Sequence, residues 1–186
     1  MISKLLNMIA LLFLQCCFAL TVFAQQQSSA YNWPLKPGMP EWKDLKTHDE
    51  MLEVLQIPVE TLQKMTTKDL AQTCLNYPLF PDIWAFNSMQ DGMERVIAGF
   101  NGLQEFLKRN DAGSGLFAIY KNMNPHNFDE SWSNLQKGKY TAEFAKIEIL
   151  LAQEDILASL DQNDRLLLLQ ESLNKQKSIR QRLFNV

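Results

Sequence analysis

The sequence predicts an all-α protein, an irregular multi-helix bundle or short helical stack of about seven to nine helices. Apolar residues recur at helical spacing through most of the chain after residue 43, and capping patterns and prolines divide that stretch into short segments. No segment shows a convincing strand pattern, and no repeat is strong enough to define a solenoid. We therefore interpret residues 43–186 as a single all-helical domain.

Helix boundaries in the first half are indicated by threonine caps. Thr47 with Glu50 and Thr66 with Asp69 match the capping pattern, in which a hydroxyl and a carboxylate three residues apart satisfy a helix N-terminus. A short helix through Met65 is expected between these two caps. A further helix is expected to begin at Pro81-Asp82. Later helical segments are expected at 90–108, 111–123, 128–136, 139–158 and from 161 to the end.

The clearest of these is the helix at 90–108, where apolar residues hold a period near 3.6 over four turns. Gly99 and Gly102 weaken this helix intrinsically, by roughly 1 kcal/mol each. We expect them to allow the close approach of a neighbouring helix. The last helix is expected to begin with Asp161 as its cap, followed by the apolar residues Leu166 to Leu169. Beyond Leu173 the helix becomes polar and is expected to project partly into solvent.

The N-terminus has the pattern of a secretory signal peptide. A positive charge at Lys4 precedes an apolar run over residues 5–23, and Val22-Phe23-Ala24 suits a signal peptidase. Residues 1–24 are therefore predicted to be removed, with export to the periplasm, the cell surface or the medium. A retained anchor and a lipoprotein are the alternatives; the latter is disfavoured because Cys16 and Cys17 lack a preceding small residue.

Residues 25–42 read as an extended leader followed by an irregular arm. Three prolines in the arm exclude regular helix, because proline fixes φ and removes a backbone donor. Trp33 and Trp42 are expected to pack this arm onto the body, since a disordered tail rarely carries two tryptophans.

Composition excludes several classes of partner. Removing residues 1–24 from 186 leaves 162, and the formal charge moves from −3 to −4 as Lys4 is lost. A mildly acidic chain argues against nucleic acid, which requires a basic face. No second apolar run approaches a membrane span. Cys74 would be the one remaining cysteine, which precludes an intramolecular disulfide and favours a buried apolar role.

The residues that catalysis or metal binding would need are sparse. His48 and His126 are the two histidines, far apart and without clustered ligands, so no metal or other cofactor is predicted. His48 is expected on a solvated face and His126 in a loop. Cys74 lies near the C-terminal end of its expected helix, where the dipole opposes a thiolate. We assign no catalytic residue, and expect that the protein is not an enzyme.

Aromatic, proline and amide residues are concentrated between residues 74 and 87. The first interpretation is a packed corner in which Phe80 and Phe86 fill the core. The alternative is that Tyr77 and Trp84 form a partly exposed aromatic shelf, with amide partners that suit sugars or extended peptides. The candidate binding residues are Asn76, Tyr77, Asp82, Trp84 and Asn87.

Several fragments in and around this region form a recognisable set: Thr66-Thr67-Lys68-Asp69-Leu70, residues 73–80, Ala85-Phe86-Asn87, Phe100-Asn101-Gly102-Leu103 and Arg109-Asn110-Asp111-Ala112. Together they resemble a recurrent pattern in secreted proteins of Bacteroidetes bacteria. The resemblance covers residues 50–125 approximately and implies export from a Gram-negative cell. It implies no activity and no site residues.

The first functional hypothesis is an exported, non-enzymatic module that binds a protein, peptide or glycan. The alternative is a hydrolase-like enzyme with a site built from scattered polar residues such as Asn76, Asp82, Asn87 and His126. A third hypothesis is a structural partner that docks its C-terminal helix, through Leu183 and Phe184, into another subunit.

Overall fold

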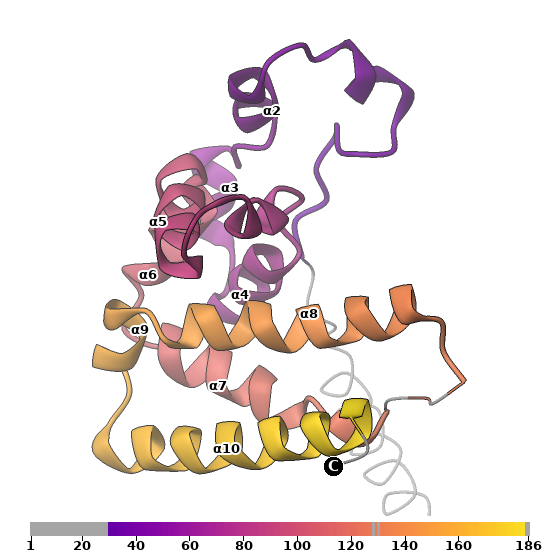
Figure 1. Cartoon of the computed structure of the whole chain (residues 1–186). Helices are drawn as coiled ribbons and strands as arrows, with labels where there is room; N and C mark the ends of the chain where they lie inside the picture. Colours follow the sequence, from indigo (N-terminus) through magenta and orange to yellow (C-terminus); the bar gives the residue numbers. More distant parts are fainter. Residues whose placement is uncertain (1–29, 128, 130, 185–186) are drawn as a thin grey trace, which may run out of the picture.

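A computed structural model of the chain describes residues 30–127, 129 and 131–184, and within these ranges all regular structure is helical (Figure 1). The all-α expectation is confirmed. The predicted signal peptide and its cleavage point lie outside the described residues. None of the described helices combines the length and apolar character that crossing a bilayer requires.

The proline-rich arm packs onto the body, as expected from its tryptophans. Trp33 is buried, and its indole Nε1 donates a hydrogen bond of 2.7 Å to the Leu55 carbonyl oxygen. Tyr31 meets the Trp33 ring edge-on and donates its backbone N–H to Thr73 Oγ1 at 2.8 Å. The arm then forms a 3-10 helix, η1 (Pro40–Asp44).

The helices that follow begin at the predicted caps. Thr47 and Glu50 form a complete capping box at the start of α2 (His48–Val54), and Thr66 accepts the Asp69 N–H at the start of α4 (Thr67–Leu75). Between them lies α3 (Val59–Lys64). The segment at Pro81 forms a 3-10 helix, η2 (Phe80–Ala85), instead of an α-helix.

The helix predicted over 90–108 is wrong as one piece, because it is two helices: α5 (Met89–Gly99) and α6 (Asn101–Leu107). Phe100 between them is extended, with φ −130° and ψ 113°. Its ring stacks on Tyr77 with centroids 4.0 Å apart. Side-chain amides satisfy the backbone groups at the break: Gln56 bonds Gly99 O and Asn101 N, while Gln104 bonds the preceding carbonyls.

Glycine permits the closest backbone approach at α5, at a different position from those expected. A Cβ on Gly92 would lie 2.2 Å from the carbonyl oxygen of Ile83, so η2 rests directly on α5. A Cβ on Gly99 would meet Leu52 of α2 at 3.1 Å, and one on Gly102 would meet the Phe100 ring. The close contact therefore joins α5 to η2.

The second half of the chain forms a layer of longer helices. In Figure 1, α8 and α10 run in opposite directions on either side of α7, and α9 joins them at one end. The segment expected over 139–158 is divided at Gln153, the N-cap of α9. The bounds are α7 (Ala112–Asn122), η3 (Pro125–Asn127), α8 (Asn134–Leu151), α9 (Glu154–Ala158) and α10 (Gln162–Phe184).

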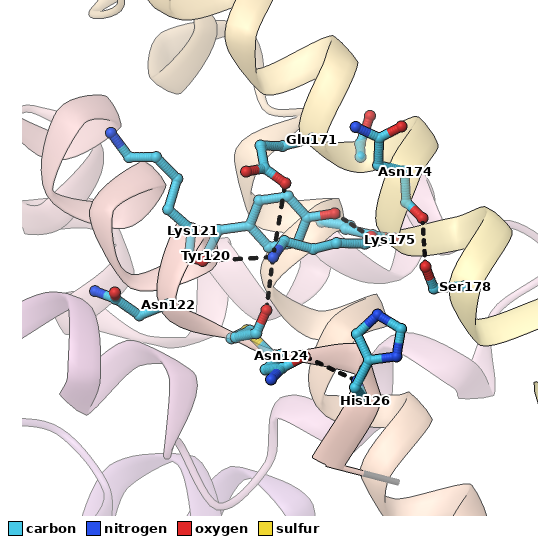
Figure 2. A network of polar contacts seen from close by, with 12 residues as sticks. Tyr120, Lys121, Asn122, Asn124, His126, Glu171, Asn174, Lys175 and Ser178 are labelled. Carbon is cyan, nitrogen blue, oxygen red and sulfur yellow. Dashed lines mark hydrogen bonds and ion pairs between the residues drawn. The ribbon is translucent and has the colours of Figure 1, made fainter.

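A buried lysine fixes α10 against α7 (Figure 2). Lys175 donates from Nζ to the Met123 carbonyl oxygen at 2.6 Å and lies 3.8 Å from a carboxylate oxygen of Glu171. This contact caps the C-terminal end of α7, where helix carbonyls lack intrahelical partners. The expected projection of α10 beyond Leu173 is therefore wrong for Lys175. The side chains of Leu183 and Phe184 lie outside the described part.

Candidate functional site

A cleft of about 400 Å³ opens between α2, η2 and the C-terminal half of α5. We call it the Tyr77 cleft. Apolar side chains from three elements form much of its wall, and polar side chains supply the rest. The apolar members are Leu52, Leu79, Phe86 and Val96, and the polar members are His48, Asp49, Tyr77, Asp82 and Arg95.

Tyr77 is the buried polar member of this wall. It follows the C-cap of α4, is 3% exposed, and is packed between Trp33 and the stacked Phe100 ring. Its hydroxyl has no hydrogen-bond partner among the described protein atoms. Burial, and secondarily the Asp82 carboxylate, raise the pKa of Tyr77 above its ordinary value. A tyrosine hydroxyl is protonated at neutral pH even at its ordinary pKa, so this group is a hydrogen-bond donor without an acceptor.

A histidine–carboxylate pair lies at the cleft. His48 Nε2 is 3.6 Å from Asp82 Oδ2, and the two side chains are 57% and 35% exposed. The capping box at Thr47 places His48 in the first turn of α2, while η2 carries Asp82. At this exposure the pair contributes about 0–1 kcal/mol to stability even when the imidazole is protonated. The pair therefore adds little to the stability of the fold.

The five predicted binding residues do not come together in one place. Tyr77 and Asp82 line the cleft, whereas Asn76, Trp84 and Asn87 do not. Asn76 is an exposed C-cap of α4. Trp84 is 45% exposed, so the predicted shelf that pairs it with a partly exposed Tyr77 is wrong, because Trp33 and Phe100 cover the tyrosine ring.

The packed-corner interpretation is correct for one aromatic residue and wrong for the other. Phe80 is fully buried, as expected, whereas Phe86 is 42% exposed and lines the cleft. His126 lies on η3, beside α7 and α10 in Figure 2, where its backbone N–H donates to the Asn124 side chain at 2.9 Å. It does not line the cleft that contains Asp82, so the scattered-residue site does not assemble as predicted.

Sequence reasoning missed the α2 and α5 contributions to the cleft. His48 and Leu52 are four residues apart on α2 and share a face, as do Arg95 and Gly99 on α5. Helical spacing could have predicted each pair. No spacing rule connects the two pairs across more than forty residues of chain.

The fragments that carry the resemblance form structural clamps between distant segments. Thr67 donates to Asp111 at 2.8 Å, and the Arg109 guanidinium donates to the Met65 carbonyl at 2.7 Å, which joins the start of α4 to the start of α7. Asn101 bonds both the N–H and the carbonyl of Ile57, at 3.0 and 2.7 Å. These polar residues therefore hold the helices in register.

No family model, curated protein or solved structure matches the chain. Within the part of the chain that the structure describes, no group of three or more His, Cys, Asp or Glu side chains is placed to hold a metal ion. Cys74 is buried, as predicted, and burial raises the pKa of its thiol well above the ordinary value.

Proposed function

We propose that this protein is an exported, non-enzymatic binding module that holds a segment of a protein, peptide or glycan in the Tyr77 cleft. The walls supply two kinds of contact. Leu52, Val96 and Phe86 offer apolar surface, while His48 and Arg95 offer polar nitrogen atoms. Polar groups placed among apolar side chains are common in ligand sites.

The unpartnered Tyr77 hydroxyl carries this proposal. A buried hydroxyl without an acceptor costs about 1–3 kcal/mol, so a fold without a use for it would gain from phenylalanine. A ligand that enters beside the exposed Phe86 and His48, and displaces the side chains that cover the hydroxyl, would supply the missing acceptor. Peptide carbonyls and sugar hydroxyls both fit, because each combines an acceptor oxygen with an apolar neighbouring surface.

Peptide and glycan arrays, followed by calorimetry on the ligands found, test the proposal. We expect Tyr77→Phe to weaken binding about tenfold, the effect of one neutral hydrogen bond of about 1.4 kcal/mol. Trp84→Ala is the matched control, because this aromatic residue lies on η2 but outside the cleft wall. Failure of the wild type to bind any array ligand, or equal binding by Tyr77→Phe, overturns the proposal.

A hydrolase-like enzyme is the second candidate, and the His48–Asp82 contact favours it. An imidazole 3.6 Å from a carboxylate is the start of a general-base arrangement. The lack of a side-chain nucleophile beside this pair favours binding, since no serine, cysteine or lysine is among the described residues that line the cleft. Turnover of an array ligand that His48→Gln abolishes while binding persists would support the enzyme and refute the binding module.

A further inference from the structure

The first half of α10 exposes several leucines. Leu168 is buried, but Leu166, Leu169 and Leu173 are 62%, 58% and 63% exposed. Residues at i, i+3 and i+7 share one face of a helix and form the narrow seam seen in helix pairs. These three leucines therefore form one exposed apolar stripe along α10.

The leucine seam of Leu166, Leu169 and Leu173 continues into a groove. This groove, of about 410 Å³, lies between α8, α9 and α10, and Leu151, Leu157 and Leu169 are among its walls. Leu157 of α9 is itself 36% exposed. The apolar surface is therefore a ridge beside a hollow, a shape that one helix can offer to another.

We propose that the leucine seam is the contact surface of a homodimer, in which α10 of a second copy lies antiparallel across it. A two-fold axis brings the same patch of both copies together, so each ridge meets the groove of the other copy. The sequence hypothesis placed a docking surface at Leu183 and Phe184, near the end of α10. The present proposal places it in the first half of the same helix.

Charge along the surface selects this occupant and this direction. Residues 154–164 contain four acidic side chains and no basic one. Residues 174–181 contain no acidic side chain, and Lys177 and Arg180 are exposed there, whereas Lys175 is buried against α7. Asp161 and Lys177 are eight residues on either side of Leu169, which is about 12 Å along a helix. Antiparallel pairing centred on Leu169 therefore brings Lys177 level with Asp161, at the acidic end of the other copy. The two-fold axis gives two such equivalent contacts.

A parallel pairing would instead bring like ends together. The acidic segment of one copy would then oppose the acidic segment of the other, and the basic ends would oppose each other in the same way. The exposed members that govern this choice are Glu154, Asp155 and Asp161 at one end, with Lys177 and Arg180 at the other.

Sedimentation velocity of the chain without residues 1–24, over a concentration series, tests the dimer. We expect a species of twice the monomer mass whose fraction grows with concentration and falls as salt is added. Leu169→Glu should remain monomeric at concentrations where the wild type is dimeric. Leu167→Glu is the matched control, since Leu167 is also exposed, at 42%, but is turned 100° from Leu166 around the helix.

A charge-exchange experiment tests the direction. The variants Glu154→Lys/Asp155→Lys and Lys177→Glu/Arg180→Glu should each dimerise at least tenfold more weakly than the wild type, and an equimolar mixture should recover association. Circular dichroism should give all variants the wild-type helix content, because the substituted side chains are already exposed.

Several outcomes overturn the proposal. A wild type that stays monomeric throughout the series excludes the second copy. Equal loss of dimer in Leu167→Glu and Leu169→Glu removes the seam as its cause. Binding of the monomer to phosphatidylglycerol vesicles, abolished by Leu169→Glu and without any dimer, would assign the seam to a lipid surface instead.

Discussion

Replacing Tyr77 by phenylalanine should stabilise the protein while it damages the proposed site. The substitution removes one oxygen and keeps the ring, so the stack on Phe100 at 4.0 Å and the contact with Trp33 remain. The hydroxyl has no partner among the described protein atoms. Removing an unsatisfied buried hydroxyl should recover about 1–2 kcal/mol of unfolding free energy.

A second Tyr→Phe substitution in the same protein provides the control, with the opposite sign. The Tyr120 hydroxyl donates to a Glu148 carboxylate oxygen at 2.6 Å. A hydrogen bond to a charged group contributes about 1.5–3 kcal/mol, so Tyr120→Phe should lower stability by that amount. Both residues are buried tyrosines, and they differ in whether the hydroxyl has a partner.

Urea unfolding at pH 7, followed by circular dichroism, measures both changes in the free energy of unfolding. In thermal unfolding of a domain of this size, 1 kcal/mol corresponds to a Tm shift of about 2–4 °C, so Tyr77→Phe should raise the Tm by about 2–8 °C. A loss of stability in Tyr77→Phe comparable to that in Tyr120→Phe would refute the reasoning, because it would show that the Tyr77 hydroxyl is bonded in the native state. A ligand of the cleft should stabilise the wild type more than this variant.

Three further predictions concern pH, a clamp and a close approach. Burial raises the pKa of Cys74 and Tyr77, so the native state keeps protons that the unfolded chain releases at alkaline pH. The free energy of unfolding should therefore be constant below pH about 9 and fall above it, by up to ~1.4 kcal/mol per pH unit for each group. A free energy of unfolding in urea that stays constant from pH 8 to 11 would contradict this. Asn101→Ala should cost about 2 kcal/mol in urea unfolding, because both backbone groups of Ile57 lose their partner, and a change below about 0.5 kcal/mol would exclude the clamp. Gly92→Ala should cost about 3 kcal/mol or more, since its methyl group would collide with the η2 backbone, and a wild-type Tm would contradict that contact.

Local chemistry made some of the fold predictable. The caps at Thr47 and Thr66 depend on side chains three residues apart, so the sequence contains all that is needed to identify them. Cys74 could be placed in the core because it shares a helical face with apolar neighbours. In each case the deciding partners lie within one or two helical turns.

The break at Phe100 could not be predicted in this way. The apolar period continues through it, and a straight helix would satisfy the same spacing. The helix is interrupted because an extended residue there lets the ring stack on Tyr77, while Gln56 from another helix bonds Gly99 O and Asn101 N. These partners are more than twenty residues away, so tertiary contacts override the local pattern.

The exposure of Tyr77 could not be predicted for the same reason, because it depends on tertiary contacts with distant residues. The arm was correctly predicted to pack, but where it packs depends on the Leu55 carbonyl, which takes the Trp33 indole N–H. That bond directs the indole donor away from Tyr77 while the ring still covers it. Trp33 and Phe100 therefore bury the tyrosine ring without providing for its hydroxyl. The result is an unsatisfied hydroxyl held at the cleft by aromatic packing, which is why we expect Tyr77→Phe to raise stability and to weaken the proposed binding.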